Sequence, residues 1–180
     1  MRIIYIVLLA AVLTAPGCAV YPTSRTYFEP NPSDGEPAPS MGCGYHAAKY
    51  DSLIRELGEV TIKVTPYYKE GEKLLVIVLF QEREDSVVVN PEHIEVESSS
   101  AHDPISPIAI KKSVQPPRSN WPYYMKWSYL TFPILSESVK AISIIFNPGS
   151  VFVDDEVIEL KPFRFKKTTK YDIYYALINC

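Results

Sequence analysis

The sequence predicts an all-β protein, an antiparallel sandwich of immunoglobulin-like form. Its 180 residues include 16 prolines and only 7 glycines, and a chain so rich in proline disfavours long helices. Its 13 tyrosines suit β-strands. Beyond Gly58, short apolar–polar alternations recur between turn residues, as expected of consecutive strands. Hydrophobic residues make up 47% and charged residues 22%, which is the composition of a folded domain.

The first two strands beyond Gly58 have the clearest patterns. Residues 59–67 place Val60, Ile62 and Val64 on one face and polar residues on the other. Residues 73–81, KLLVIVLFQ, form a continuous apolar run, which is typical of a strand buried on both faces. The second segment is therefore expected at the centre of a sheet.

Shorter strands follow, with prolines at their edges or bends. The segment 147–150, Asn-Pro-Gly-Ser, is a strong turn signal, and the pair Asp154-Asp155 fits a tight hairpin. The remaining expected strands are 86–90, 92–97, 105–111, 123–132, 139–146, 151–153, 156–160, 163–167 and 171–178.

Residues 45–57 do not fit the strand pattern. Leu53, Ile54 and Leu57 have helical spacing, and Gly58 is suited to end a helix. Two interpretations stay open for this segment, a short helix near residues 46–57 or an irregular crossing.

The N-terminus has the form of an export signal. Arg2 precedes an apolar run of 11 residues, from position 3 to position 13. This run is about half of the ~20 residues that a helix needs to cross a bilayer. A basic start, a short apolar run and small residues after it are typical of a cleaved signal peptide.

The small residues of that signal lead to a cysteine. The segment 14–19, TAPGCA, places Gly17 directly before Cys18. It resembles the lipobox of bacterial lipoproteins, in which small residues precede an obligatory cysteine. The resemblance implies that residues 1–17 are removed, that Cys18 carries a diacylglyceryl group and an acylated amino group, and that Ala19 directs the protein to the outer membrane. The alternative is an ordinary secretory signal that is cleaved nearby.

The other cysteines then form a pair. The chain has three cysteines, and an odd cysteine in an exported protein needs an explanation, which lipidation of Cys18 supplies. Cys43 and Cys180 are left, and an oxidising compartment favours a disulfide between them. Such a bond would join the start of the domain to its end. The alternative is two free, buried thiols.

Between the lipidation residue and the domain, the composition changes. The segment 18–41 contains five prolines among polar residues and has no strand or helix period. Proline-rich polar segments favour extended, polyproline-like conformations. The sequence therefore predicts a spacer over 18–41 and a single domain over 42–180.

No pattern of catalytic or metal-binding residues stands out. The three histidines, His46, His93 and His102, lack the spacing of a metal site, and no nucleophile or phosphate-binding motif is present. A net charge of −3 gives no reason to expect nucleic acid as a partner. We therefore expect that the chain is not an enzyme and that it uses no cofactor or metal.

The aromatic segment 121–129, WPYYMKWSY, is the strongest candidate for a binding surface. In a strand, Tyr123, Met125, Trp127 and Tyr129 share one face, whereas Tyr124 lies on the other. These rings could form a platform for a sugar or a protein partner, or one face could simply be core. The core interpretation is favoured for Trp127, and a surface role has more weight for Trp121.

A second candidate surface is basic. It consists of Lys161, Arg164, Lys166, Lys167 and Lys170. A solvated strand face is the favoured interpretation, and contact with anionic lipid or polysaccharide is the alternative.

These observations lead to an expectation about function. We expect an exported protein that the lipid on Cys18 holds at the cell envelope, at the outer membrane and facing the periplasm. Its domain is expected to serve as a non-catalytic accessory or scaffold module that binds an envelope protein. A module that binds glycan or another envelope ligand through residues 121–129 is the alternative.

Overall fold

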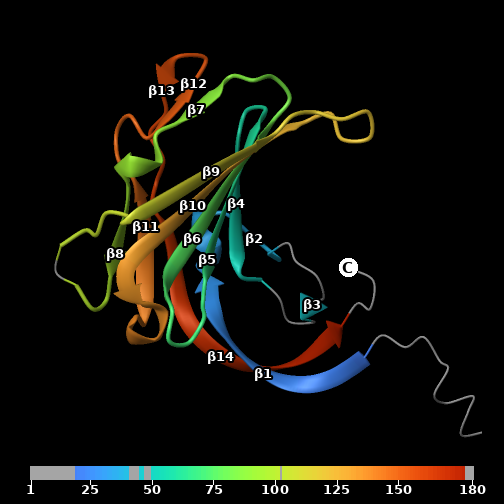
Figure 1. Ribbon diagram of the computed structural model, residues 1–180, viewed down its shortest axis with the longest axis vertical. Helices are drawn as coiled ribbons and strands as arrows, with labels where there is room; N and C mark the ends of the chain where they lie inside the picture. Colours follow the sequence, from blue (N-terminus) through green and yellow to red (C-terminus); the bar gives the residue numbers. More distant parts are fainter. Residues whose placement is uncertain (1–18, 41–44, 47–49, 102, 177–180) are drawn as a thin grey trace, which may run out of the picture.

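The computed structural model describes residues 19–40, 45–46, 50–101 and 103–176 (Figure 1). Over these residues the chain forms β-strands and short 3-10 turns, and no α-helix. All paired strands are antiparallel, and two large sheets form a sandwich. The predicted all-β antiparallel sandwich is thus confirmed.

The first sheet has six strands, in the order β2-β4-β5-β6-β10-β9. Its centre is built by the two segments with the clearest sequence patterns, which pair with each other, and the second of them also pairs with the aromatic segment. The strands are β2 (Glu36–Ala38), β4 (Ser52–Leu57), β5 (Val60–Tyr67), β6 (Lys73–Glu82), β9 (Ala109–Gln115) and β10 (Tyr124–Leu135).

The second sheet has the order β1-β14-β11-β8, and β3 also pairs with β14. A small third sheet, β13-β12-β7, lies at one end of the molecule. The strands are β1 (Ala19–Pro30), β3 (Tyr45–His46), β8 (Ile94–Ser98), β11 (Ala141–Phe146), β14 (Phe163–Ala176), β7 (Val87–Val89), β12 (Val151–Val153) and β13 (Glu156–Val157).

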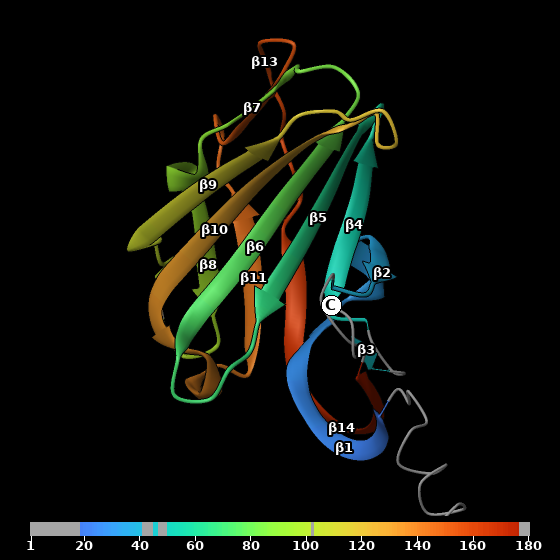
Figure 2. The same cartoon turned by 45° about the vertical axis from the view of Figure 1, so that its right-hand side comes forward.

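The hydrophobic core lies between the two large sheets, which Figure 2 shows one behind the other. In the first sheet the core residues are at even positions of β5, β6 and β10, such as Ile62, Val78 and Leu130, all fully buried. The second sheet contributes residues such as Phe28 and Phe163. β5, β6 and β10 therefore each have one face toward the core and one face away from it.

The predicted spacer over residues 18–41 is wrong where the structure describes it. Residues 19–30 form β1, which pairs in continuous register with β14 from Ala19↔Ala176 to Pro30↔Phe165. Residues 36–38 form β2, and Phe28 is in the core. The prolines are compatible with these strands because β1 and β2 are both edge strands, where a missing N–H costs little.

The short helix considered near residues 46–57 is also wrong where the structure describes that segment. Residues 52–57 form β4, and residues 45–46 form the short strand β3. Leu53 and Leu57 are four apart, a spacing that also places them on one face of a strand, so the sequence pattern did not distinguish the two structures. Gly58, with φ of 60°, begins the turn into β5 and does not end a helix.

Three further strand predictions can be compared with the structure. The hairpin at Asp154-Asp155 is present, with φ of 50° and 64°, as a two-residue turn with positive φ requires. The strand expected at 105–111 lies instead at 109–115, and Ile105 makes only an isolated bridge to Val96. The two strands expected at 163–167 and 171–178 form the single strand β14, because β1 pairs along its length.

Candidate functional site

The candidate site lies on the outer face of the six-stranded sheet. In β10, Ser128 and Leu130 are buried on the core side, so strand alternation turns Trp127 and Tyr129 outward. Both rings are partly exposed, and neither packs in the core. The favoured prediction of a core position for Trp127 is therefore wrong. Alternation separated the two faces of the strand correctly, but the position of the second sheet determines which face is core.

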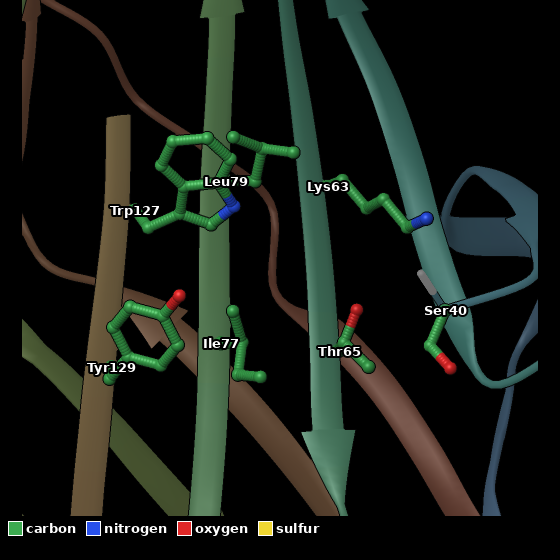
Figure 3. Close-up of a pocket in the computed structure, with 7 residues that line it drawn as sticks. All are labelled: Ser40, Lys63, Thr65, Ile77, Leu79, Trp127 and Tyr129. Atoms are coloured by element: carbon green, nitrogen blue, oxygen red, sulfur yellow. The ribbon is translucent and has the colours of Figure 1, made fainter. Parts of the chain in front are cut away.

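Register aligns two rows of side chains across this face. One row runs from Lys63 on β5 through Leu79 on β6 to Trp127 on β10. The second row runs in the same way from Thr65 through Ile77 to Tyr129. Figure 3 shows the two rows side by side, with Ser40 beside β4.

Together these seven residues line a shallow groove of about 300 Å³. One side of the groove is apolar, formed by two aromatic rings and two branched aliphatic side chains, and its polar residues lie toward the other side. Apolar surfaces with a few polar groups at the margin are typical of ligand pockets and protein interfaces.

The polar side chains of the groove are already hydrogen-bonded within the protein. The Thr65 hydroxyl lies 2.7 Å from the Ser52 hydroxyl. The Ser40 hydroxyl donates to Asp51 at 2.8 Å, and the Lys63 ammonium donates to the Pro39 carbonyl. The groove therefore offers a ligand mainly its aromatic and aliphatic surfaces, together with the Tyr129 hydroxyl and the Trp127 indole N–H.

A buried carboxylate positions the edge of the groove. Asp51 is 4% exposed, and its oxygens accept hydrogen bonds from the Ser40 amide at 2.5 Å and from Arg25 of β1 at 2.5 Å. Burial alone raises the pKa of Asp51, but the hydrogen bonds from Arg25 and Ser40 outweigh it and hold the pKa below its usual value. Asp51 thus connects β1 to the groove.

We expect Asp51→Asn to destabilise the protein by about 1.5–3 kcal/mol at neutral pH, because charged hydrogen bonds are lost. A carboxyl whose pKa is lowered by folding stabilises the folded state above its unfolded pKa of about 4, and this contribution is lost as pH falls through the folded value. The stability difference from wild type should therefore be constant above pH ~5 and shrink in more acidic solution.

Urea unfolding of both proteins between acidic and neutral pH measures this difference. Asp155→Asn, in an exposed turn, is the matched control and should change stability little at any pH. A pH-independent difference between Asp51→Asn and wild type would contradict the prediction.

The other predicted aromatic residues lie apart from the groove. Trp121 is 40% exposed and contacts Tyr123 edge to face, with ring centroids 5.7 Å apart. Arg83 lies over the Tyr123 ring. Tyr124 is half-buried and, by alternation, is on the same side of β10 as Ser128. The structure thus brings together Trp127 and Tyr129 but not all five candidates.

Sequence reasoning missed the floor of the groove, although a signal for it existed. The apolar run in residues 73–81 predicted a strand covered on both faces. Its even residues are covered by the second sheet, but Leu75 and Ile77 on the outer face are only partly buried. The run therefore indicates an apolar outer face that the described part of this chain does not fully cover.

Two of the five residues of the candidate basic surface pair with acidic side chains. Arg164 donates to Asp34 from Nε at 2.7 Å and from Nη2 at 2.5 Å, which lowers the pKa of Asp34. Lys170 pairs with Glu29, and Lys167 donates to a backbone carbonyl. These contacts favour the solvated, structural interpretation of the strip.

Several predictions concern residues outside the described part of the chain. These are the signal peptide 1–17, lipidation of Cys18, the Cys43–Cys180 disulfide and any role of His102. Among the described residues, no three His, Cys, Asp or Glu side chains lie close enough to hold a metal ion. The described residues also contain no helix of the length and apolarity needed to span a bilayer.

Comparison of the chain with protein-family models, with curated proteins and with solved structures finds no match.

Proposed function

We propose that this chain is a lipid-anchored protein of the cell envelope that binds a partner protein through the outer face of its six-stranded sheet. In this proposal the signal peptide is removed before Cys18, the lipid on Cys18 inserts into the outer membrane, and the domain faces the periplasm. The domain acts as an accessory or scaffold module and catalyses no reaction.

The observation that carries the proposal is the apolar groove around Trp127. A central strand with apolar residues on both faces is expected where both faces are covered, yet one face of β6 is only partly covered. Tyrosine and tryptophan at the centre of such a surface are typical of the residues that contribute most to protein–protein binding. A partner that covers Ile77, Trp127 and Tyr129 would complete the burial of this face.

A glycan is the second candidate, because rings such as Trp127 and Tyr129 can stack on sugars. Sugar recognition also needs polar groups that can bond to sugar hydroxyls. In this groove the hydroxyls of Ser40 and Thr65 and the ammonium of Lys63 have internal partners. The Tyr129 hydroxyl and the Trp127 indole N–H are the other polar groups of the groove, and so small a number favours an apolar protein surface over a sugar.

The proposal can be tested by photo-cross-linking in living cells. A photoreactive amino acid at position 77 or 129 is expected to capture one specific envelope protein, whereas the same group at Val88, an exposed residue of β7, is not. Trp127→Ala should abolish the cross-link from position 77, because the larger of the two aromatic rings of the groove is lost. Trp121→Ala is the matched control and should leave the cross-link unchanged, because Trp121 lies outside the groove.

Two outcomes would contradict the protein-binding proposal. One is a cross-link that survives Trp127→Ala in a protein whose circular dichroism is unchanged. The other is no cross-link from either groove position together with binding of the purified protein to cell-wall glycan that Trp127→Ala abolishes. The second outcome would establish the glycan-binding alternative.

A further inference from the structure

The strands β1 and β14 continue beyond the sandwich as a two-stranded ribbon. Figures 1 and 2 both show this curved ribbon projecting from the end of the molecule opposite to β13. Its outer part runs from the pair Ala19↔Ala176 to the pair Arg25↔Lys170. The ribbon is therefore the part of the described domain that is nearest in sequence to Cys18.

The two faces of this outer ribbon differ in charge. Directly opposite residues point to the same face, so Pro22 and Ser24 share a face with their partners Ile173 and Tyr171. The four side chains that the structure describes on this face of the outer ribbon are therefore all uncharged. The opposite face holds the charged residues Arg25, Lys170 and Asp172.

The uncharged face is open to its surroundings. Tyr171 is 94% exposed and Ile173 is 43% exposed, and Pro22 and Ser24 are also exposed. Tyr171 has the highest exposure of the large hydrophobic side chains in the described residues. Since both apolar residues project from a paired strand, their positions are set by the ribbon backbone.

We propose that this face of the ribbon lies in the lipid–water interface, with Tyr171 and Ile173 inserted among the lipid headgroups. The proposal rests on the proposed lipid anchor at Cys18. Ser24 is six residues from Cys18, so even a fully extended chain separates the two by only about 20 Å. Tyr171, which is opposite Ser24, is therefore held within reach of the bilayer surface to which the anchor is attached.

The chemistry of the face fits this position. Tyrosine is enriched at membrane interfaces because its ring is apolar and its hydroxyl can stay hydrated. The acyl chains proposed on Cys18 are enough for stable attachment, but a fixed orientation of the domain needs an additional contact with the membrane. The ribbon supplies such a contact, and β1 begins at the residue after Cys18, with no spacer between them. The domain is thus held in one orientation relative to the membrane.

The test uses the full-length lipidated protein in vesicles of phosphatidylethanolamine and phosphatidylglycerol. An environment-sensitive fluorescent amino acid is placed at position 171 or 173, and the matched control carries it at Val157, an exposed residue of β13 at the far end of the molecule. Emission from 171 and 173 should shift to the blue and be lost when the lipids carry a nitroxide near the headgroup. Emission from position 157 should show neither change.

Flotation of the same vesicles separates the ribbon proposal from the anchor. Protein that floats with the vesicles but has unquenched emission at 171 and 173 would overturn the ribbon contact and leave the anchor intact. A blue shift without quenching by the nitroxide lipid would also overturn it, since a protein partner or a second copy would then cover the face. Protein that does not float would overturn the anchor and the ribbon proposal with it.

Discussion

Phe28→Ala is expected to lower the free energy of unfolding by about 3–5 kcal/mol, the usual cost of truncating a buried phenylalanine. Phe28 is fully buried in the core between the sheets, and its ring meets Tyr68 edge to face with centroids 6.2 Å apart. Alanine would remove these contacts and leave a cavity that the two packed sheets can close only in part. Urea unfolding followed by circular dichroism measures the effect.

Phe28→Ala tests whether residues 19–30 form a strand or a flexible spacer. Pro22→Ala is the matched control, because it lies in the exposed part of the same strand and should change the stability by less than about 0.5 kcal/mol. If residues 19–30 were a flexible spacer, both substitutions would have the small effect. An unchanged unfolding midpoint for Phe28→Ala would therefore contradict the strand and support the spacer that the proline content predicts.

Lys126→Met is expected to destabilise the protein by about 3–5 kcal/mol, because it leaves a buried carboxylate without its counter-charge. Glu82 is 1% exposed, and its Oε1 lies 2.6 Å from the Lys126 ammonium. Its Oε2 accepts hydrogen bonds from the Val87 amide at 2.8 Å and from the Ser86 amide at 3.0 Å. The ion pair therefore holds the loop between β6 and β7 against β10.

The double variant Glu82→Gln/Lys126→Met tests the cause of this effect. Without the buried negative charge, the loss of the ammonium should cost much less, so the two substitutions should not be additive. Asp85 also contacts Lys126, at 2.7 Å, but its side chain is 62% exposed, so Asp85→Asn is a matched control with an effect of at most about 1 kcal/mol. Additive losses in urea unfolding would show that the pair is not the source of the stability.

The titration of Lys126 should not change the stability of the fold near pH 7. Burial lowers the pKa of Lys126, but hydrogen bonds to Asp85 and Glu82 outweigh burial and raise the pKa above its usual value. A raised lysine pKa stabilises the folded state below the unfolded value of about 10.4, and this contribution is lost only at more alkaline pH.

The ribbon and the groove are connected by one set of contacts. Arg25 lies in β1, where the ribbon meets the sandwich, and pairs with Asp51, which in turn binds the amide and hydroxyl of Ser40. Ser40 lines the groove. If the ribbon rests on the membrane as proposed, this connection gives the groove a defined position above the bilayer.

Local patterns in the sequence were sufficient to predict most of the strands. The apolar–polar alternation in residues 60–64 and the two aspartates at 154–155 each depend on a local rule, the two-residue period of a strand and the positive φ of a tight hairpin. The aromatic segment was likewise predicted as a strand with two distinct faces. Two of the seven residues that line the candidate site, Trp127 and Tyr129, were among the residues singled out.

The remaining features depended on contacts between distant segments. Residues 19–30 contain prolines that suggest a spacer, and only their pairing with residues 165–176 makes them a strand. Leu53 and Leu57 fit one face of a helix or of a strand, and pairing with β5 decided between the two. A local period defines the faces of a strand but not its neighbours or the face that is covered. For this reason the sequence by itself determined the all-β class and most of the strands, whereas the tertiary structure alone decided that Trp127 faces outward.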